Sequence, residues 1–394
     1  MSELREYKLV DVIDKFIDYR GKTPKKTNQG IPLVTAKIVK NGKILEPNEF
    51  ISPDDYNSWM TRGYPEIDDV VLTTEAPLGE VALIKDKNVA LAQRIITLRG
   101  KRNLLFNPYL KYYFQSGKGQ HNLLSRASGT TVFGIKASVL KEMPIELPDI
   151  DEQKTIASVL SSLDDKIDLL HRQNKTLEAI AETLFRQWFI EEAQDDWETV
   201  KVGDFVETNI SSINKDYPFD TIKYLDTGSI TEGVIEDYQT LNLNDSPSRA
   251  KRLVQHNDVI VSTVRPNQKH YGIVKYPDDN LVLSTGFCVI SCKKIDPHFI
   301  YILLTTDEMT EYLHSVAEGS TSTYPSLKPS DIEQVEFQLP PGSKMREFAI
   351  LTRDTWNKID KNHNQIKTLE KLRDTLLPKL MSGEVRVKLE GSHA

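Results

Sequence analysis

The chain has 394 residues, of which 39% are apolar and 27% are charged, a balance that is typical of globular domains with buried cores. It contains only two cysteines and no run of about 18 apolar residues, which excludes a disulfide framework, a four-ligand zinc site and a membrane span. The N-terminal segment is charged and lacks the apolar core of a signal peptide, so we expect a soluble, cytoplasmic protein.

The net charge of −7 is distributed unevenly along the chain. Residues 1–146 carry 22 Lys and Arg against 17 Asp and Glu, a net of +5, whereas residues 197–338 carry 12 against 21, a net of −9. The first segment is compatible with a nucleic-acid partner, and the second argues against one unless a local basic cluster makes the contact. Residues 147–196 (net −7) and 339–394 (net +4) have opposite signs, which favours their pairing with each other.

Residues 1–146 are predicted to form one globular domain of short strands. Runs of β-branched residues bounded by turn residues occur at 7–11, 33–44 and 69–74. A long helix follows within 147–192. It is expected to begin near Asp149–Asp151, because acidic residues favour a helix N-terminus.

The helix predicted within 147–192 carries an apolar seam whose steps alternate between four and three residues, which is the heptad of a coiled coil. The seam includes Ile156, Leu160, Leu163, Ile167, Leu170, Asn174, Leu177, Leu184 and Trp188. The alternative is a helix that packs only on its own globular domain. The coiled coil is favoured because the heptad persists over more than four repeats.

The second half of the chain repeats the first. At an offset of 192, Lys166-Ile167-Asp168 matches Lys358-Ile359-Asp360, and upstream, with small gaps, Asp69–Thr74 resembles Asp258–Thr263. We therefore predict a second globular domain at 193–338, a second helix at 339–383 and a C-terminal tail at 384–394. The expected fold is mixed α/β (α+β): two globular domains joined by two long helices that form an antiparallel coiled coil, with pseudo-twofold symmetry.

The second helix is expected to start near Ser343 and to end at Ser382-Gly383. Its seam includes Phe348, Ile359, Asn362, Ile366, Leu369, Leu376 and Leu380. The two seam amides, Asn174 and Asn362, set the register, because buried amides favour each other. Pairing them antiparallel also predicts that Trp188 meets Phe348 and that the end of the second helix returns to the first globular domain near Tyr7–Val12.

This order of globular domains and helices, together with several short sequence motifs, resembles the specificity (S) subunit of type I restriction–modification systems. The matching words are Gly129–Lys136, Leu147-Pro148 with Glu152-Gln153, Leu184–Phe189 and Leu376–Glu384. The second copy departs from the pattern, because Gly319–Tyr324 replaces the Gly-Thr-Thr motif and Lys344-Met345 stands in place of Glu152-Gln153.

The resemblance implies that the globules are target recognition domains, each reading one half of a split target in double-stranded DNA. It further implies that the helices set the spacer and dock two adenine methyltransferase (modification) subunits. Two restriction motor subunits are further candidate partners. The methyltransferases would carry S-adenosylmethionine and flip the adenine, so the chain itself would hold no cofactor or metal and would not be an enzyme.

Basic and small polar residues in loops are the candidates for DNA contact, because forked guanidinium groups read guanine edges and hydroxyl groups suit phosphate oxygens. An ordinary solvated loop, surface ion pair or turn is the competing interpretation for each cluster. The candidates are Arg20, Lys22, Lys25, Lys26, Thr130, Thr131 and Lys136 in the first half, and Arg249, Lys251, Arg252, Arg265, Lys269, His270, Ser320, Thr321, Ser322, Tyr324 and Lys328 in the second.

Two other classes of function remain open: a self-contained DNA nuclease or methyltransferase, and a coiled-coil scaffold without DNA binding. Pro148-Asp149 with Glu152-Gln153-Lys154 imitates a nuclease motif. Its parts lie too close together, however, to converge on a metal ion from separate strands. Asn107-Pro108-Tyr109 lacks the second proline of the adenine methylase word. We find no catalytic residues.

Overall fold

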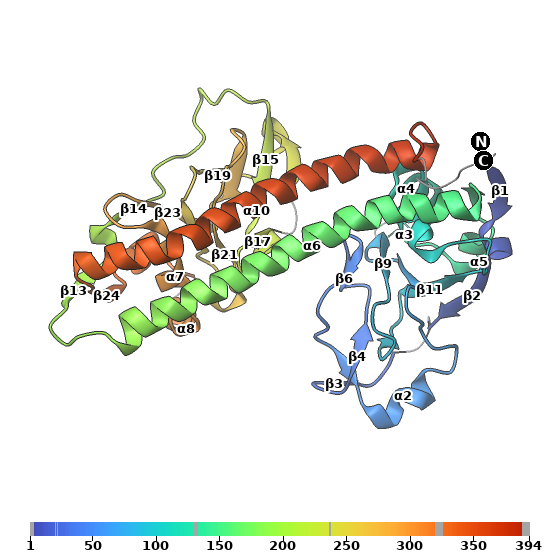
Figure 1. Cartoon of the computed structure of the whole chain (residues 1–394), viewed down its shortest axis with the longest axis horizontal. Coiled ribbons are helices and arrows are strands. Elements are labelled where there is room, and N and C mark those ends of the chain that lie inside the picture. Colours follow the sequence, from blue (N-terminus) through green and yellow to red (C-terminus); the bar gives the residue numbers. More distant parts are fainter. Residues whose placement is uncertain are drawn as a thin grey trace. The chain divides into compact units, whose positions relative to one another are not determined.

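The computed structural model describes residues 4–19, 21, 23–129, 133–235, 238–319 and 326–387. The chain divides into two compact units, of which unit 1 comprises residues 1–169 and 366–394 and unit 2 comprises residues 170–365. Each unit holds one set of short strands and a stretch of both long helices, α6 (Ile150–Arg186) and α10 (Gly342–Ser382) (Figure 1). Among the described residues, no helix has the length and apolar content needed to cross a membrane.

Unit 1 is built around an antiparallel four-stranded sheet with helices packed on it. The sheet has the order β2 (Ile13–Asp18), β11 (Ile95–Gly100), β8 (Val70–Thr74), β9 (Leu78–Leu83). A second sheet has the order β10 (Ala90–Leu91), β4 (Ile31–Val34), β7 (Phe50–Ile51), β3 (Lys26–Thr27). Two pairs complete the strands, β1 (Arg5–Lys8) with β12 (Pro144–Leu147) and β5 (Val39–Lys40) with β6 (Lys43–Ile44). The short helices are α1 (Leu9–Val12), α2 (Pro53–Trp59), α3 (Asn107–Gln115), α4 (Gly117–Leu124) and α5 (Ala137–Lys141).

Unit 2 repeats this topology. Its central sheet has the order β14 (Val206–Thr208), β23 (Phe287–Cys292), β20 (Val259–Ser262), β21 (Tyr271–Ile273). The second sheet has the order β18 (Gln239–Asn242), β15 (Thr221–Leu225), β22 (Leu281–Ser284), β19 (Ala250–Leu253). The pairs are β13 (Glu198–Lys201) with β24 (Glu336–Leu339) and β16 (Ile230–Thr231) with β17 (Val234–Ile235), and the helices are α7 (Pro297–Thr305), α8 (Asp307–Glu318) and α9 (Pro329–Glu333).

The predicted internal repeat is therefore visible as a repeated strand order. Both central sheets are antiparallel, and both second sheets contain one parallel pair, β4 with β10 and β15 with β22. The second sheets differ at their edges. In unit 1, β3 pairs with β7, whereas in unit 2 β19 extends the sheet beyond β22.

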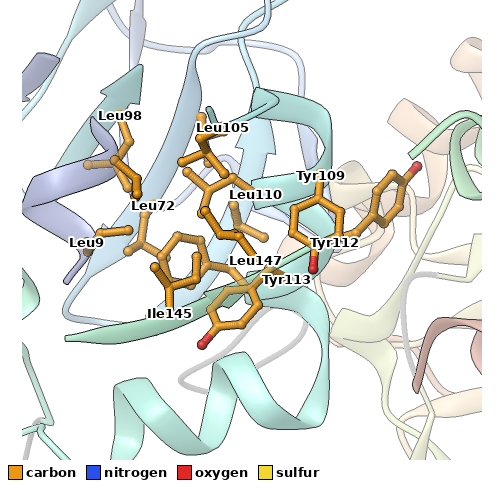
Figure 2. Close-up of a cluster of buried hydrophobic side chains, with 14 of the residues drawn as sticks. Leu9, Leu72, Leu98, Leu105, Tyr109, Leu110, Tyr112, Tyr113, Ile145 and Leu147 are labelled. Carbon is orange, nitrogen blue, oxygen red and sulfur yellow. The ribbon is translucent and has the colours of Figure 1, made fainter. Parts of the chain in front are cut away.

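The core of unit 1 gathers side chains from segments that are far apart in the sequence. Leu72 and Leu98 of the central sheet meet Leu110 of α3 and Ile145 of β12 (Figure 2), and all four are fully buried. Leu380, near the end of α10, belongs to the same cluster. The last helix of the chain thus completes the hydrophobic core of the first globular domain, because burial of apolar area is the main stabilising contribution to folding.

The ends of the long helices follow local rules. Asp149 caps α6, because its Oδ1 atom accepts hydrogen bonds from the amides of Asp151 (3.1 Å) and Glu152 (2.8 Å). Gly383 follows α10 with a φ of +76°, the left-handed conformation that ends many helices. Past Arg186 the backbone of Gln187–Glu191 widens into a π-helical turn. This turn places Phe189 against Phe348, with ring centroids 4.9 Å apart.

The seam within unit 2 confirms the predicted antiparallel register. Asn362 Nδ2 donates to Asn174 Oδ1 at 2.8 Å, and Trp188 contacts Phe348 with centroids 6.4 Å apart. Between these contacts the residue number rises by 14 on α6 and falls by 14 on α10, so the helices run in opposite directions.

The helix stretches within unit 1 follow the same direction. Arg373 pairs with Asp164 at 3.3 Å and Arg386 with Glu152 at 3.4 Å. The second of these pairs brings the chain segment that follows α10 back to the start of α6. Every predicted seam residue on both helices is buried or half-buried.

Lysines of the globular domains are anchored on the helices at equivalent repeat positions. Lys43 pairs with Asp168 in unit 1, and Lys275 pairs with Asp360 at 3.2 Å in unit 2. These two aspartates are separated by the repeat offset of 192. The two helix carboxylates at this repeated position thus each pair with a lysine from a globular domain.

A second buried ion pair fastens α3 to α6. Lys111 Nζ lies 2.8 Å from Asp164 Oδ2, and their side chains are 8% and 16% exposed. Tyr112 donates to the same oxygen at 2.7 Å. Burial alone would raise the pKa of Asp164, but Lys111, Tyr112 and Arg373 together hold that pKa below its usual value.

Removal of one seam amide should destabilise the protein more than removal of both. Asn362→Leu would leave the buried amide of Asn174 without its partner, at a cost of about 1–3 kcal/mol. The double variant with Asn174→Leu should recover most of that loss, since two leucines pack without a polar group. Urea unfolding of the four proteins in a double-mutant cycle measures the coupling, and two small additive losses would contradict the paired arrangement.

Replacement of the buried carboxylate should be costly and should change the acid stability. Asp164→Asn would leave Lys111 buried without a counter-charge, which costs about 3 kcal/mol. Because the pKa of Asp164 is lowered in the folded protein, the stability it contributes is present above its unfolded pKa and is lost as the pH falls through its folded pKa.

The matched control for that variant is Asp374→Asn. Asp374 pairs with the same Arg373 at 2.9 Å, but its side chain is 65% exposed, so the loss should be below about 1 kcal/mol. Urea unfolding between pH 3 and 7 compares the three proteins, and equal losses for the two variants would contradict the structural role of Asp164.

Candidate nucleic-acid interface

Strand β20 of unit 2 ends in a turn that holds Arg265 in an unusual backbone conformation. Arg265 has a φ of +50° and is followed by Pro266. A left-handed non-glycine residue costs about 1–3 kcal/mol and is enriched at functional sites. The side chain is exposed. The turn thus presents a guanidinium group at the end of a rigid, buried strand.

Strand β8 of unit 1 ends in the same kind of turn. Ala76 has a φ of +47°, precedes Pro77 and is exposed, as Arg265 precedes Pro266 in unit 2. The backbone hydrogen bonds also correspond. Thr74 N donates to Arg94 O at 2.9 Å, as Thr263 N donates to Gly286 O at 2.7 Å.

A loop segment crosses each of these turns in the same way. Glu75 bridges to Gly134 in unit 1, and Val264 bridges to Ser326 in unit 2. Gly134 belongs to the Gly-Thr-Thr motif, Gly129–Lys136, noted in the sequence analysis. Lys136 and Lys328 follow these bridges as exposed residues at the starts of α5 and α9. The structure therefore brings the candidate lysines of both loops next to the two strand-end turns.

Lys26, from the predicted basic cluster in the first half, also lies beside its turn. A hollow of about 270 Å³ is lined by residues of the 23–26 segment and by residues around the turn, namely Thr23, Pro24, Lys26, Thr35, Ala36, Lys37, Glu49, Ala76, Ala92, Gln93 and Arg94. Lys26 pairs with Glu49 at 2.7 Å, and Lys25 is exposed. Three cations and one carboxylate thus border the hollow.

The predicted basic residues of the second half divide into three groups. Arg249 lies next to the turn through the hydrogen bond from Thr285 N to its carbonyl oxygen at 2.7 Å, and its side chain pairs with Asp226 at 2.5 Å. Lys251 and Arg252 follow along β19 away from the turn, since that strand runs antiparallel to β22. Only the first group shares the turn of Arg265.

The third group, Lys269 and His270, is held by contacts within the protein. Lys269 lies 2.7 Å from Asp307 and 3.3 Å from Glu232, and its pKa is raised, chiefly by the hydrogen bond that it donates to Asp307. His270 Nδ1 donates to Ile230 O at 2.6 Å. These contacts favour a structural role for both side chains over a role in DNA contact.

Eight of the predicted DNA-contact residues lie outside the described residues: Arg20, Lys22, Thr130, Thr131, Ser320, Thr321, Ser322 and Tyr324. Sequence reasoning did not single out Ala76 or Arg94, whose place beside the turn depends on backbone hydrogen bonds. The signal that could have found Ala76 was the match of Ala76-Pro77 with Arg265-Pro266 in the repeat. Among the described residues, no group of three or more His, Cys, Asp or Glu side chains is arranged to hold a metal ion.

The structure thus holds two globular domains of related topology, each with an exposed strand-end turn near basic residues and each packed on a stretch of both long helices. Comparison with known proteins identifies the family. The model of the type I restriction modification DNA specificity domain matches residues 1–179 and again residues 194–371. The chain therefore belongs to the family of type I restriction–modification specificity (S) subunits, which are non-catalytic.

Two curated relatives and one solved structure illustrate the similarity. The type I restriction enzyme MjaIX specificity subunit of Methanocaldococcus jannaschii is 30% identical over 346 residues, which cover 81% of this chain and 78% of the relative. The putative type I restriction enzyme MjaX specificity subunit of the same organism is 24% identical and covers 98% and 94%. The crystal structure of the S subunit from M. genitalium aligns with a TM-score of 0.53 at 16% identity, covering 98% of this chain and 97% of the other, and shows the same fold. The function of the chain is DNA target recognition within a type I restriction–modification system.

Replacement of Arg265 by glycine should weaken DNA binding without lowering the stability of the protein. Glycine adopts the left-handed conformation without strain, so Arg265→Gly should unfold at an equal or slightly higher temperature, whereas Arg265→Ala keeps the strain. Both variants should weaken DNA binding of the assembled complex by about tenfold or more, the range of a lost bidentate base contact. Thermal unfolding and DNA titration measure the two effects, and unchanged DNA affinity for both variants would contradict a contact by this side chain.

Proposed function

We propose that the chain reads a bipartite DNA target, one half-sequence through residues 1–146 and the other through residues 193–338. The observation that carries this proposal is the strand-end turn that occurs once in each unit, with Ala76-Pro77 and Arg265-Pro266 at equivalent positions. Two copies of one recognition device on one chain match a target with two parts. The local cations around each turn overcome the unfavourable net charge of the second half.

The two long helices would act as a ruler that sets the spacer between the half-sequences. The α6 helix contains 37 residues, so at about 1.5 Å per residue it is about 55 Å long, the length of about 16 base pairs. A continuous coiled-coil pair is stiff compared with a loop. The separation of two DNA contacts along the duplex would then depend on helix length and not on the recognition domains.

The helices would also dock two adenine methyltransferase subunits, which carry S-adenosylmethionine, with two restriction motor subunits as additional partners. Apolar side chains outside the seam support this part of the proposal. Leu169 and Ile180 on α6 are 40% and 49% exposed, and Ile350, Leu351 and Leu372 on α10 are 58%, 51% and 44% exposed. A docked subunit would bury these side chains, and burial of apolar area favours association.

Co-expression with the methyltransferase subunit of a type I restriction–modification system tests the proposal directly. Methylated adenines are then mapped across the host genome, with the methyltransferase alone as the control. We expect methylation at a single motif of two short half-sequences separated by a constant number of unspecified bases. A continuous motif, or methylation that does not depend on this chain, would contradict the proposal. Metal-dependent cleavage of DNA by the purified chain alone would support a self-contained nuclease instead.

Insertion of one heptad into each helix, after Asn174 and after Ile366, should widen the spacer without changing the half-sequences. Seven residues keep the seam in phase and add about 10 Å, or about 3 base pairs. The recognition domains would also rotate by about 100° around the duplex, so methylation should be weaker. The mapped motif is the readout, and a changed half-sequence with an unchanged spacer would rule out the ruler.

The matched control for the insertion is replacement of residues 1–146 by the recognition domain of another family member. One half-sequence should change while the spacer stays nearly constant. This control also shows which half-sequence each domain reads.

A further inference from the structure

The two strand-end turns carry their arginines at different positions. The position of Ala76 in unit 1 is occupied by Arg265 in unit 2, because each residue is left-handed, follows the central strand and precedes a proline. The position of Gly286 in unit 2 is occupied by Arg94 in unit 1, because each accepts the hydrogen bond from the strand-end threonine. Each turn therefore has one arginine at one of two adjacent positions.

Steric space explains why unit 2 does not use the second position. A Cβ atom on Gly286 would lie 2.9 Å from Thr227 Cγ2, closer than real Cβ contacts. Unit 1 has room at that position, because Arg94 borders the hollow of about 270 Å³ beside Ala76. The arginine thus stands at the position of Arg94 in unit 1 and at the position of Arg265 in unit 2.

Arg94 also has the features of a side chain that is kept for a contact outside the chain. Its φ is +69°, a conformation in which glycine would be favoured. Its side chain is 53% exposed and pairs with Glu75 at 3.1 Å, itself 45% exposed. An ion pair at that exposure contributes little to stability, so it does not account for an arginine in a strained conformation.

We propose that Arg94 is the base-reading arginine of unit 1, equivalent to Arg265 of unit 2, and that it recognises a guanine in the half-sequence read by residues 1–146. Guanidinium groups bind the O6 and N7 atoms of guanine through two parallel hydrogen bonds, the commonest specific contact to a base. Glu75 orients the guanidinium before DNA is bound. The neighbouring Gln93 also lines the hollow and places an amide beside the same contact. This inference rests on the proposed division of the target between the two domains.

The test uses the complete complex with the methyltransferase and a panel of duplexes, each changed at one base pair of the mapped motif. The ratio of Kd between a changed duplex and the correct duplex is measured at every position. For Arg94→Ala we expect the discrimination to fall by about 10-fold to 100-fold at one G·C pair in the half-sequence of unit 1. The other half-sequence and the spacer should stay unchanged. Arg265→Ala should show the mirror result, with the loss in the half-sequence of unit 2.

Two further variants distinguish base reading from a contact to phosphate and from a general loss of charge. Arg94→Lys keeps the positive charge but lacks the planar guanidinium group that makes two parallel hydrogen bonds, so it should lose the same discrimination as Arg94→Ala. Arg102→Ala is the matched control. Arg102 is exposed beyond the other end of the same strand, β11, and its loss should leave every ratio unchanged.

Three results would overturn the proposal: unchanged ratios in Arg94→Ala, a uniform loss of affinity at all positions that Arg94→Lys restores, or a loss in the half-sequence of unit 2. The first would show that Arg94 makes no base contact, and the second would show a phosphate contact. Thermal unfolding should be nearly unchanged in all variants, since exposed substitutions seldom exceed about 0.5 kcal/mol. Failure of the proposed function would be recognised separately, because the unmodified complex would then yield no bipartite motif.

Discussion

The antiparallel pairing of α6 with α10 is the constraint on which both compact units depend. Unit 1 is not a continuous piece of chain, because it takes its last helix stretch from residues 366–394, whereas unit 2 is the single segment 170–365. The seam that joins the two helices in unit 2 includes one buried amide hydrogen bond, from Asn362 to Asn174. A polar pair in an apolar seam contributes little to stability but penalises every shifted register, because a shift leaves both amides buried without a partner. The register then places Leu380 in the core of unit 1 and Phe348 against Trp188 in unit 2.

Duplication explains why the chain keeps some features twice and has lost others. The central sheets, the helix carboxylates Asp168 and Asp360 and the strand-end turns are shared by both copies. These features hold each recognition domain together and on its helices, so a change would disrupt packing or, at Asp360, a buried ion pair. The exposed side chains around the turns differ between the copies, as expected for surfaces that contact different DNA sequences.

The acidic net charge of the second domain, −9, does not by itself oppose DNA recognition, because surface charges act only over short distances. Asp226 pairs with Arg249, Asp278 with Lys223 at 2.9 Å, and Asp307 with Lys269. These pairs leave the net charge of −9 unchanged. Screening limits surface charges to about 8–10 Å, so charges farther than that from a phosphate group repel it little.

The sequence by itself determined the features that follow local rules of periodicity and capping. The heptad predicted both long helices, and the opposite charges of the two helices favoured their pairing. The two seam amides predicted the register, and the offset of 192 predicted the repeated topology. These predictions succeeded because heptad spacing and helix caps depend on residues within one or two turns of each other.

Only the tertiary structure decided which side chains meet at the strand-end turns. Arg94 and Gly286 are equivalent because the carbonyl oxygen of each accepts a hydrogen bond from the amide of a threonine, 20 and 23 residues earlier in the chain. Lys111 would be expected from the sequence to be a solvated charge, but its side chain is 8% exposed and packs against Asp164. No local pattern reports either fact, because a left-handed backbone and a buried charge are sustained by distant segments that pack around them.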